Sequence, residues 1–167
     1  ATVGIVYSQR NQDFFGRDDA RVLVDLPSRG MTEALTRARI PYVLVHADDL
    51  AEASKDLRAL VLPNLGVMTD EHVAAVHAFA ARGGGLVATG ATSVCDAFGD
   101  ARSTLALGDL FGVQLPADHP LRVEDERRRR AAASTQTYLR LLPELRAGVD
   151  GPHVAGEPPA VPFCRIE

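Results

Sequence analysis

The sequence contains no tryptophan, and aromatic residues make up only 5% of its 167 positions. Nucleic-acid sites that stack bases, and sugar sites that stack rings, depend on aromatic side chains. An excess of positive charge is also missing, since the net charge at pH 7 is -4. General nucleic-acid binders and proteins of anionic membrane surfaces need a basic surface. We therefore expect neither nucleic acid nor a membrane as a partner.

Cysteine and long hydrophobic runs are scarce as well. The two cysteines, Cys95 and Cys164, are too few for a disulfide framework, and such thiols are typical of a reducing compartment. No stretch approaches the roughly 20 apolar residues that span a bilayer. The chain starts with a predicted strand and without Met, so no signal peptide is visible and we expect a piece of a longer protein. These absences favour a cytoplasmic location.

Hydrophobic residues nevertheless make up 46% of the chain, which is enough for one folded domain with a core. Four short apolar runs, each suited to a buried parallel strand, alternate with helical patterns. The runs are residues 2–7, 42–45, 60–62 and 86–89. This alternation predicts an α/β fold, a three-layer α/β/α sandwich with a mostly parallel sheet.

Residues 56–90 give the clearest pattern, because strand, loop, helix, glycine turn and strand follow without interruption. Thr69 is suited to cap the helix, whose first turn carries acids that the helix dipole favours. Gly83 is suited to end it. The triple glycine precedes a strand, whereas a phosphate-binding loop follows one, so no phosphate site is expected. We expect the buried stripe of this helix at Val73, Val76, Phe79 and Ala80.

The flanking segments are less regular. Residues 8–19 are polar and predict a loop that Phe14 and Phe15 anchor, and Pro27 is suited to open the next helix. We expect residues 1–115 to form the core of the domain. Residues 116–167 are rich in charge, Gly and Pro, and predict an extension that packs on the same domain and is partly irregular.

Ligands of open parallel sheets bind beyond the carboxyl ends of the strands, and this edge is polar here. A small-ligand site is one interpretation, although polar strand ends are ordinary in any such fold. No histidine or cysteine spacing typical of a metal site occurs, so we expect no metal and no cofactor. The candidate ligand rim consists of Gln9, Arg10, His46, Asn64, Thr92 and Ser93.

Cys95 is the candidate nucleophile near this edge, but a reactive thiolate needs a base. His46 or His119 would have to approach it through folding, because no histidine is near it in the sequence. No Gly-x-Cys-x-Gly or Gly-x-Ser-x-Gly elbow is present, and a buried structural cysteine is the simpler interpretation. Asp96 and Arg102 are predicted to form an ion pair that holds the loop after the last strand.

A resemblance to a known family rests on three parts of the chain. They are VGIVYSQ near the start together with ALTRARIPYVLVHADDL at residues 34–50, the segment LRALVLPNLGVMTDEHVAAVHAFAARGGGLVATG, and residues 92–113. These motifs resemble the β-galactosidase trimerisation domain, the middle domain of family 42 glycoside hydrolases. Such domains are related to the class I glutamine amidotransferase-like superfamily, so the resemblance implies a flavodoxin-like sheet. It also implies a non-catalytic module that supports a homo-oligomer of the trimer type in an enzyme of carbohydrate metabolism.

The same resemblance places no catalytic residue in this chain. Family 42 enzymes carry their two catalytic glutamates on a separate barrel, so we expect a catalytic barrel domain outside the chain as its partner. Amidotransferase-like enzymes carry a nucleophilic Cys after the strand that here ends in Ala88-Thr89-Gly90, and Cys95 comes too late. A sugar-binding rim and a Cys95-dependent amidotransferase-like hydrolase remain as alternatives.

Overall fold

The structure is a computed structural model that describes residues 2–114, so the predicted extension, Cys164 and His119 lie outside the described residues. Within them one all-parallel sheet has the strand order β2-β1-β3-β4, which confirms the predicted α/β class. The strands are β1 (Val3–Tyr7), β2 (Tyr42–His46), β3 (Ala59–Pro63) and β4 (Gly85–Thr89). The helices are α1 (Leu26–Arg37), α2 (Leu50–Ala53), α3 (Asp70–Ala81) and α4 (Gly108–Phe111).

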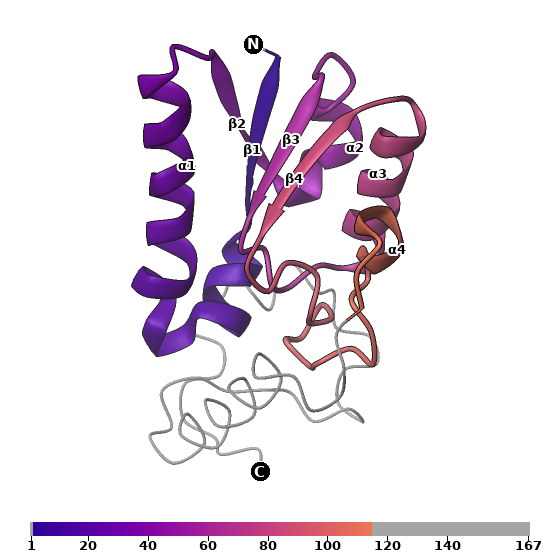
Figure 1. Cartoon of the computed structure of the whole chain (residues 1–167). Helices are drawn as coiled ribbons and strands as arrows, with labels where there is room; N and C mark the ends of the chain where they lie inside the picture. The colour runs from indigo at the N-terminus through magenta and orange to yellow at the C-terminus, as the bar shows by residue number, and fades with distance from the viewer. Residues whose placement is uncertain (1, 115–167) are drawn as a thin grey trace.

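Figure 1 shows α1 on one side of the sheet and α2 and α3 on the other. The main core fills the space between the sheet and α3. Leu60 and Leu62 of β3 pack with Val76 and Phe79 of α3, and all four are fully buried. Burying a side chain of this size stabilises the fold by roughly 1.5–3 kcal/mol. The predicted stripe of α3 is thus confirmed at its centre, while its two outer positions are only partly buried.

The apolar side chains on the sheet face that α1 covers are less completely buried. The register sets Leu44, Ile5, Val61 and Val87 opposite one another in a row across the four strands. Because side chains alternate between the two faces of a sheet, this row lies on the α1 side, away from the main core. Its inner members are buried, but Leu44 is 62% exposed and Val87 is 49% exposed. No residue of α1 itself is buried. Within the described residues, this face therefore leaves apolar surface at both edges.

The segment between β1 and α1 is helical, which corrects the loop predicted for residues 8–19. It forms the short turns η1 (Asn11–Gly16), η2 (Arg17–Asp19) and η3 (Arg21–Asp25). Phe14 and Phe15 are buried in a second, smaller core, so the predicted anchors are confirmed. Burial of these two rings against the rest of the domain stabilises the turns. Most of the neighbouring residues are polar, so the sequence shows no helical periodicity here.

The ends of α3 follow the sequence signals. The Thr69 hydroxyl accepts a hydrogen bond from the backbone N–H of His72 at 3.2 Å, and the His72 ring accepts one from the Thr69 N–H at 3.3 Å. Gly83 follows the helix at φ +89°, a conformation that suits glycine. Within residues 2–114 no helix has the length and apolarity needed to cross a membrane.

One added methyl group at Gly84 tests the packing of the main core. A Cβ there would overlap the buried ring of Phe79, so Gly84→Ala should lower the free energy of unfolding by about 1–3 kcal/mol. Gly30 in α1 is a matched control, because a Cβ there meets no atom within 4 Å. Gly30→Ala should raise the free energy of unfolding by about 0.5–1 kcal/mol through helix propensity. Urea denaturation measures both, and equal stabilities for the two variants would contradict this packing.

Candidate functional site

Asn64, directly after β3, lies at the centre of the polar sheet edge. Its Nδ2 donates a hydrogen bond to the carbonyl of Leu23 at 2.7 Å, and its Oδ1 accepts one from the N–H of Ala91 at 2.7 Å. Its φ of +50° lies in the left-handed region, which asparagine tolerates better than most residues. Both ends of this predicted rim amide are therefore engaged in joining the loops that precede α1 and follow β4.

Thr92 and Ser93 have a similar role in the turn after β4. The Thr92 hydroxyl accepts a hydrogen bond from the Leu65 N–H at 3.2 Å and donates to the Thr89 carbonyl at 2.7 Å. The Ser93 hydroxyl accepts one from the Leu107 N–H at 3.1 Å. Both residues are buried. These two predicted rim hydroxyls thus satisfy backbone groups of the fold itself.

The position after β4 has no space for a nucleophilic side chain. Gly90 has φ +59°, and a Cβ built there would overlap the side-chain amide of Asn64. Cys95 follows in the chain and is fully buried, in backbone bridges with Val67 and Ala101. Burial of this kind is typical of a structural cysteine, whereas a catalytic thiol has to be reachable by its substrate.

Arg10 and Gln9 follow β1 but differ in their surroundings. Arg10 is only 3% exposed, and its guanidinium donates to the carbonyl of Ala97 at 2.9 Å. Burial lowers the pKa of Arg10, while the nearby carboxylates of Asp48 and Glu71 raise it. Gln9, in contrast, is exposed. Arg10 therefore anchors the loop that carries Ala97, and only its neighbour faces solvent.

His72 also lies at this edge, although the sequence analysis does not include it in the candidate rim. The residue is buried, with only 3% exposed. Its Nε2 lies 2.7 Å from Oδ1 of Asp48, while its Nδ1 accepts the hydrogen bond from Thr69. Since Nδ1 accepts, Nε2 must carry the proton and donate it to Asp48. Both ring nitrogens are thus engaged, and neither is left to serve as a base. The signal in the sequence is the histidine of T-x-x-H, which stands where a capping box has Glu or Gln.

His46, the last residue of β2, contacts the same carboxylate. Its Nδ1 lies 3.6 Å from Oδ2 of Asp48, and its ring packs edge-on against Tyr7 at 5.1 Å between centroids. Burial lowers the pKa of His72, and the hydrogen bond and charge of Asp48 raise it less. The cluster therefore joins the end of β2 to the start of α3 around a neutral His72. Across residues 2–114, no group of three or more His, Cys, Asp or Glu is placed to hold a metal ion.

The predicted ion pair between Asp96 and Arg102 is replaced by another. Arg102 pairs with Asp70, the first residue of α3, at 2.8 Å. Oδ1 of Asp96 accepts hydrogen bonds from the N–H groups of Phe98 and Asp100, both at 2.9 Å. The physical reason is side-chain length, because a short aspartate closes onto its own loop, whereas the longer arginine reaches across to the helix.

Solved structures of β-galactosidases are among those that resemble this fold. A β-galactosidase from Bifidobacterium adolescentis superposes with a TM-score of 0.59 and 19% identity, over 68% of this chain and 54% of its own. Gan42B, a GH42 β-galactosidase, gives a TM-score of 0.51 and 21% identity, over 62% of this chain and 15% of its own. The chain thus spans about half of the first structure and a small part of the second. At these identities the likeness shows the fold.

Neither a scan against protein-family models nor a search of curated proteins finds a match.

The Asn64 amide is tested by Asn64→Asp, which replaces the side-chain NH2 group with an oxygen and keeps the shape of the side chain. The acceptor for Ala91 remains, but the donor becomes a carboxylate oxygen that faces the Leu23 carbonyl. We expect the free energy of unfolding to fall by about 1–3 kcal/mol, measured by urea denaturation without any ligand. Gln114→Glu makes the same chemical change at an exposed position and should be neutral. An unchanged midpoint for Asn64→Asp would show that the amide does not hold this edge.

His72 should make stability depend on pH. Because its pKa is lower in the folded chain than the ordinary 6.5, the unfolded chain binds the extra proton first as pH falls. The stability that the neutral ring contributes is therefore complete above about pH 6.5 and is lost progressively below it.

His72→Gln separates this titration from the helix cap, since glutamine can also bond back to Thr69. The melting temperature of the native chain should fall below about pH 6.5, and that of His72→Gln should fall less steeply. Parallel melting curves for the two chains would assign the pH dependence to other groups.

Proposed function

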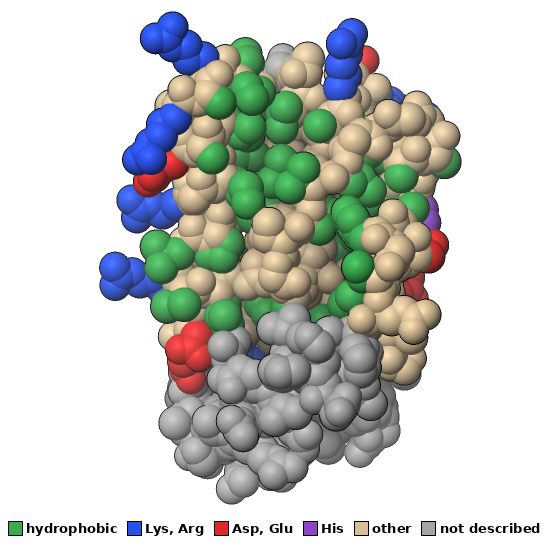
Figure 2. All heavy atoms as spheres, in the orientation of Figure 1, with side chains coloured by type: hydrophobic (Ala, Val, Ile, Leu, Met, Phe, Trp, Pro, Cys, Tyr) green, Lys and Arg blue, Asp and Glu red, His purple; other side chains and the backbone are tan. Residues whose placement is uncertain are grey.

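We propose that this chain is a non-catalytic oligomerisation domain, of the trimerisation type, from a glycoside hydrolase related to family 42 β-galactosidases. The observation that carries the proposal is the incomplete α1 face, with Leu44 and Val87 exposed at its two edges. Figure 2 shows apolar side chains gathered beside α1 over the sheet. Large contiguous apolar patches are unusual on monomers and mark sites of association. Contact with another copy would remove this surface from water.

The likeness to β-galactosidase structures supports the same proposal. The superposed region is a minor part of Gan42B, so such a fold exists within a larger glycosidase. In this chain the space beside Gly90 is filled by Asn64, and Cys95 is buried, which supports a role without catalysis. The proposed partners are further copies of the chain and a catalytic barrel domain outside it, in a cytoplasmic enzyme of carbohydrate metabolism.

The mass of the full chain in solution tests this function. We expect light scattering after size exclusion to give three times the monomer mass, with dissociation on dilution. Leu44→Asp combined with Val87→Asp should favour monomers, because the contact would then bury unpaired charges. Val113→Asp places the same charge on an exposed apolar residue outside the sheet and should leave the mass unchanged. A native chain that stays monomeric at all working concentrations would overturn the proposal.

A further inference from the structure

We propose that copies of this chain associate head to tail, with the α1 face of one copy against the acidic α2–α3 side of the next. This inference rests on the proposed function and adds the two surfaces that meet. The α1 face comprises the exposed side of α1 together with Leu44 and Val87. The acidic side comprises the surface of α2 and the first turn of α3.

The exposed side of α1 carries a positive stripe. Arg29 and Arg37 lie about two helical turns apart, roughly 12 Å, and Glu33 lies between them. Arg37 pairs with Glu33 at 3.5 Å, and both side chains are largely exposed. Arg29 has no ion-pair partner in the part of the chain that the structure describes. One arginine of the stripe is therefore available for a carboxylate of another molecule.

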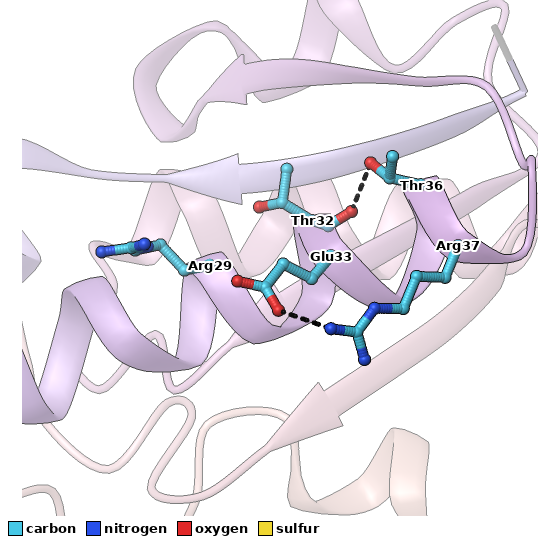
Figure 3. A pocket seen from close by; sticks show the side chains of 5 residues that line it. All are labelled: Arg29, Thr32, Glu33, Thr36 and Arg37. Atoms are coloured by element: carbon cyan, nitrogen blue, oxygen red, sulfur yellow. Dashed lines mark hydrogen bonds and ion pairs between the residues drawn. The ribbon is translucent and has the colours of Figure 1, made fainter.

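A pocket lies along this helix, and Figure 3 shows the side chains that line it. Its volume is about 500 Å3, and the same charged residues line it together with Thr32 and Thr36. Figure 2 shows the Lys and Arg side chains projecting along the α1 edge, next to the apolar side chains over the sheet. The α1 face therefore offers a polar hollow that carries two arginines beside exposed apolar side chains of the sheet, which suits a partner with exposed acids.

The other side of the sheet offers such acids. They are Asp48, Asp49, Glu52, Asp56, Asp70 and Glu71, all exposed on or beside α2 and at the start of α3. Two basic residues on this side are already engaged, since Lys55 pairs with Glu52 and Arg82 donates to Ser54. Asp49 and Asp56 have no ion-pair partner among residues 2–114. Both are therefore available to a positive surface.

The charge pattern favours unlike surfaces over like ones. If two α1 helices met antiparallel around Glu33, Arg29 of each copy would lie near Arg37 of the other, and like charges across an interface cost free energy. A contact between the α1 face and the acidic side sets opposite charges together and covers the apolar row at the same time. Contacts between two different surfaces close into rings when the rotation allows. A three-membered ring is the closed form that the proposed trimer requires.

Charge reversal of the full chain tests the contact. Arg29→Glu with Arg37→Glu reverses the α1 stripe, and Asp49→Lys with Asp56→Lys reverses the acidic side. Each pair places like charges across the contact, so the mass at low salt should fall to that of the monomer. Combining all four substitutions restores opposite charges and the native net charge, so the native mass should return. Circular dichroism checks that every variant is folded.

A mixture of the two reversed pairs gives a second readout. Opposite charges then meet only between unlike chains, so a three-membered ring cannot close and complexes with an even number of copies are expected.

The outcomes separate this inference from the proposed function. A monomeric native chain would overturn both. A native oligomer that survives both reversals would overturn the head-to-tail contact and leave the proposed function intact. If only the α1 reversal dissociates the oligomer and the fourfold exchange does not restore it, the partner of the α1 face is another acidic surface, and the inference is wrong.

Discussion

The side-chain amide of Asn64 holds together three loops that a parallel sheet brings to one edge. Parallel strands all point the same way, so the loops that follow them crowd at the carboxyl end, and their backbone groups need partners. The side-chain amide of Asn64 bonds to the loops at Leu23 and Ala91, and the backbone carbonyl of Asn64 accepts a hydrogen bond from Nδ2 of Asn11 at 3.2 Å. Asn11 in turn accepts from the Val67 N–H at 3.0 Å. The side-chain amides of Asn64 and Asn11 thus satisfy backbone groups that would otherwise need water or a ligand.

This use of the edge limits its chemistry. A polar group that already bonds to backbone gains little from a ligand, because one bond must break for the other to form. The same amide also fills the space that a side chain at Gly90 would need, so packing of the edge and a nucleophile at that place exclude each other. The hydroxyls of Thr92 and Ser93 are engaged in the same way. The polar character of an edge is therefore weak support for ligand binding until the partners of each group are known.

The elements that can be predicted from the sequence are those that neighbouring residues determine. The apolar runs predict the four strands, and Thr69 and Gly83 set the ends of α3, because each signal acts within a few residues. The burial of His72 depends on Asp48, 24 positions away, and the pairing of Arg102 depends on Asp70, 32 positions away. No local pattern contains such pairs. The roles of the predicted rim residues likewise follow from loops that only the folded chain brings together.

The two faces of the sheet differ in what they need from outside. Around α3 the fully buried leucines and Phe79 complete their packing within the domain, so the apolar core on that side needs no cover from another molecule. On the α1 side the row from Leu44 to Val87 is covered only at its centre, and apolar area there gains about 25 cal/mol per Å2 on burial. Burial of apolar area favours binding but does not fix how the two molecules are oriented. The arginines of α1 disfavour contact with another positive surface, so they select the orientation of the partner. An apolar row with a charged border thus carries affinity and specificity in separate residues, which is why charge can be exchanged across the contact without altering the apolar surface that it covers.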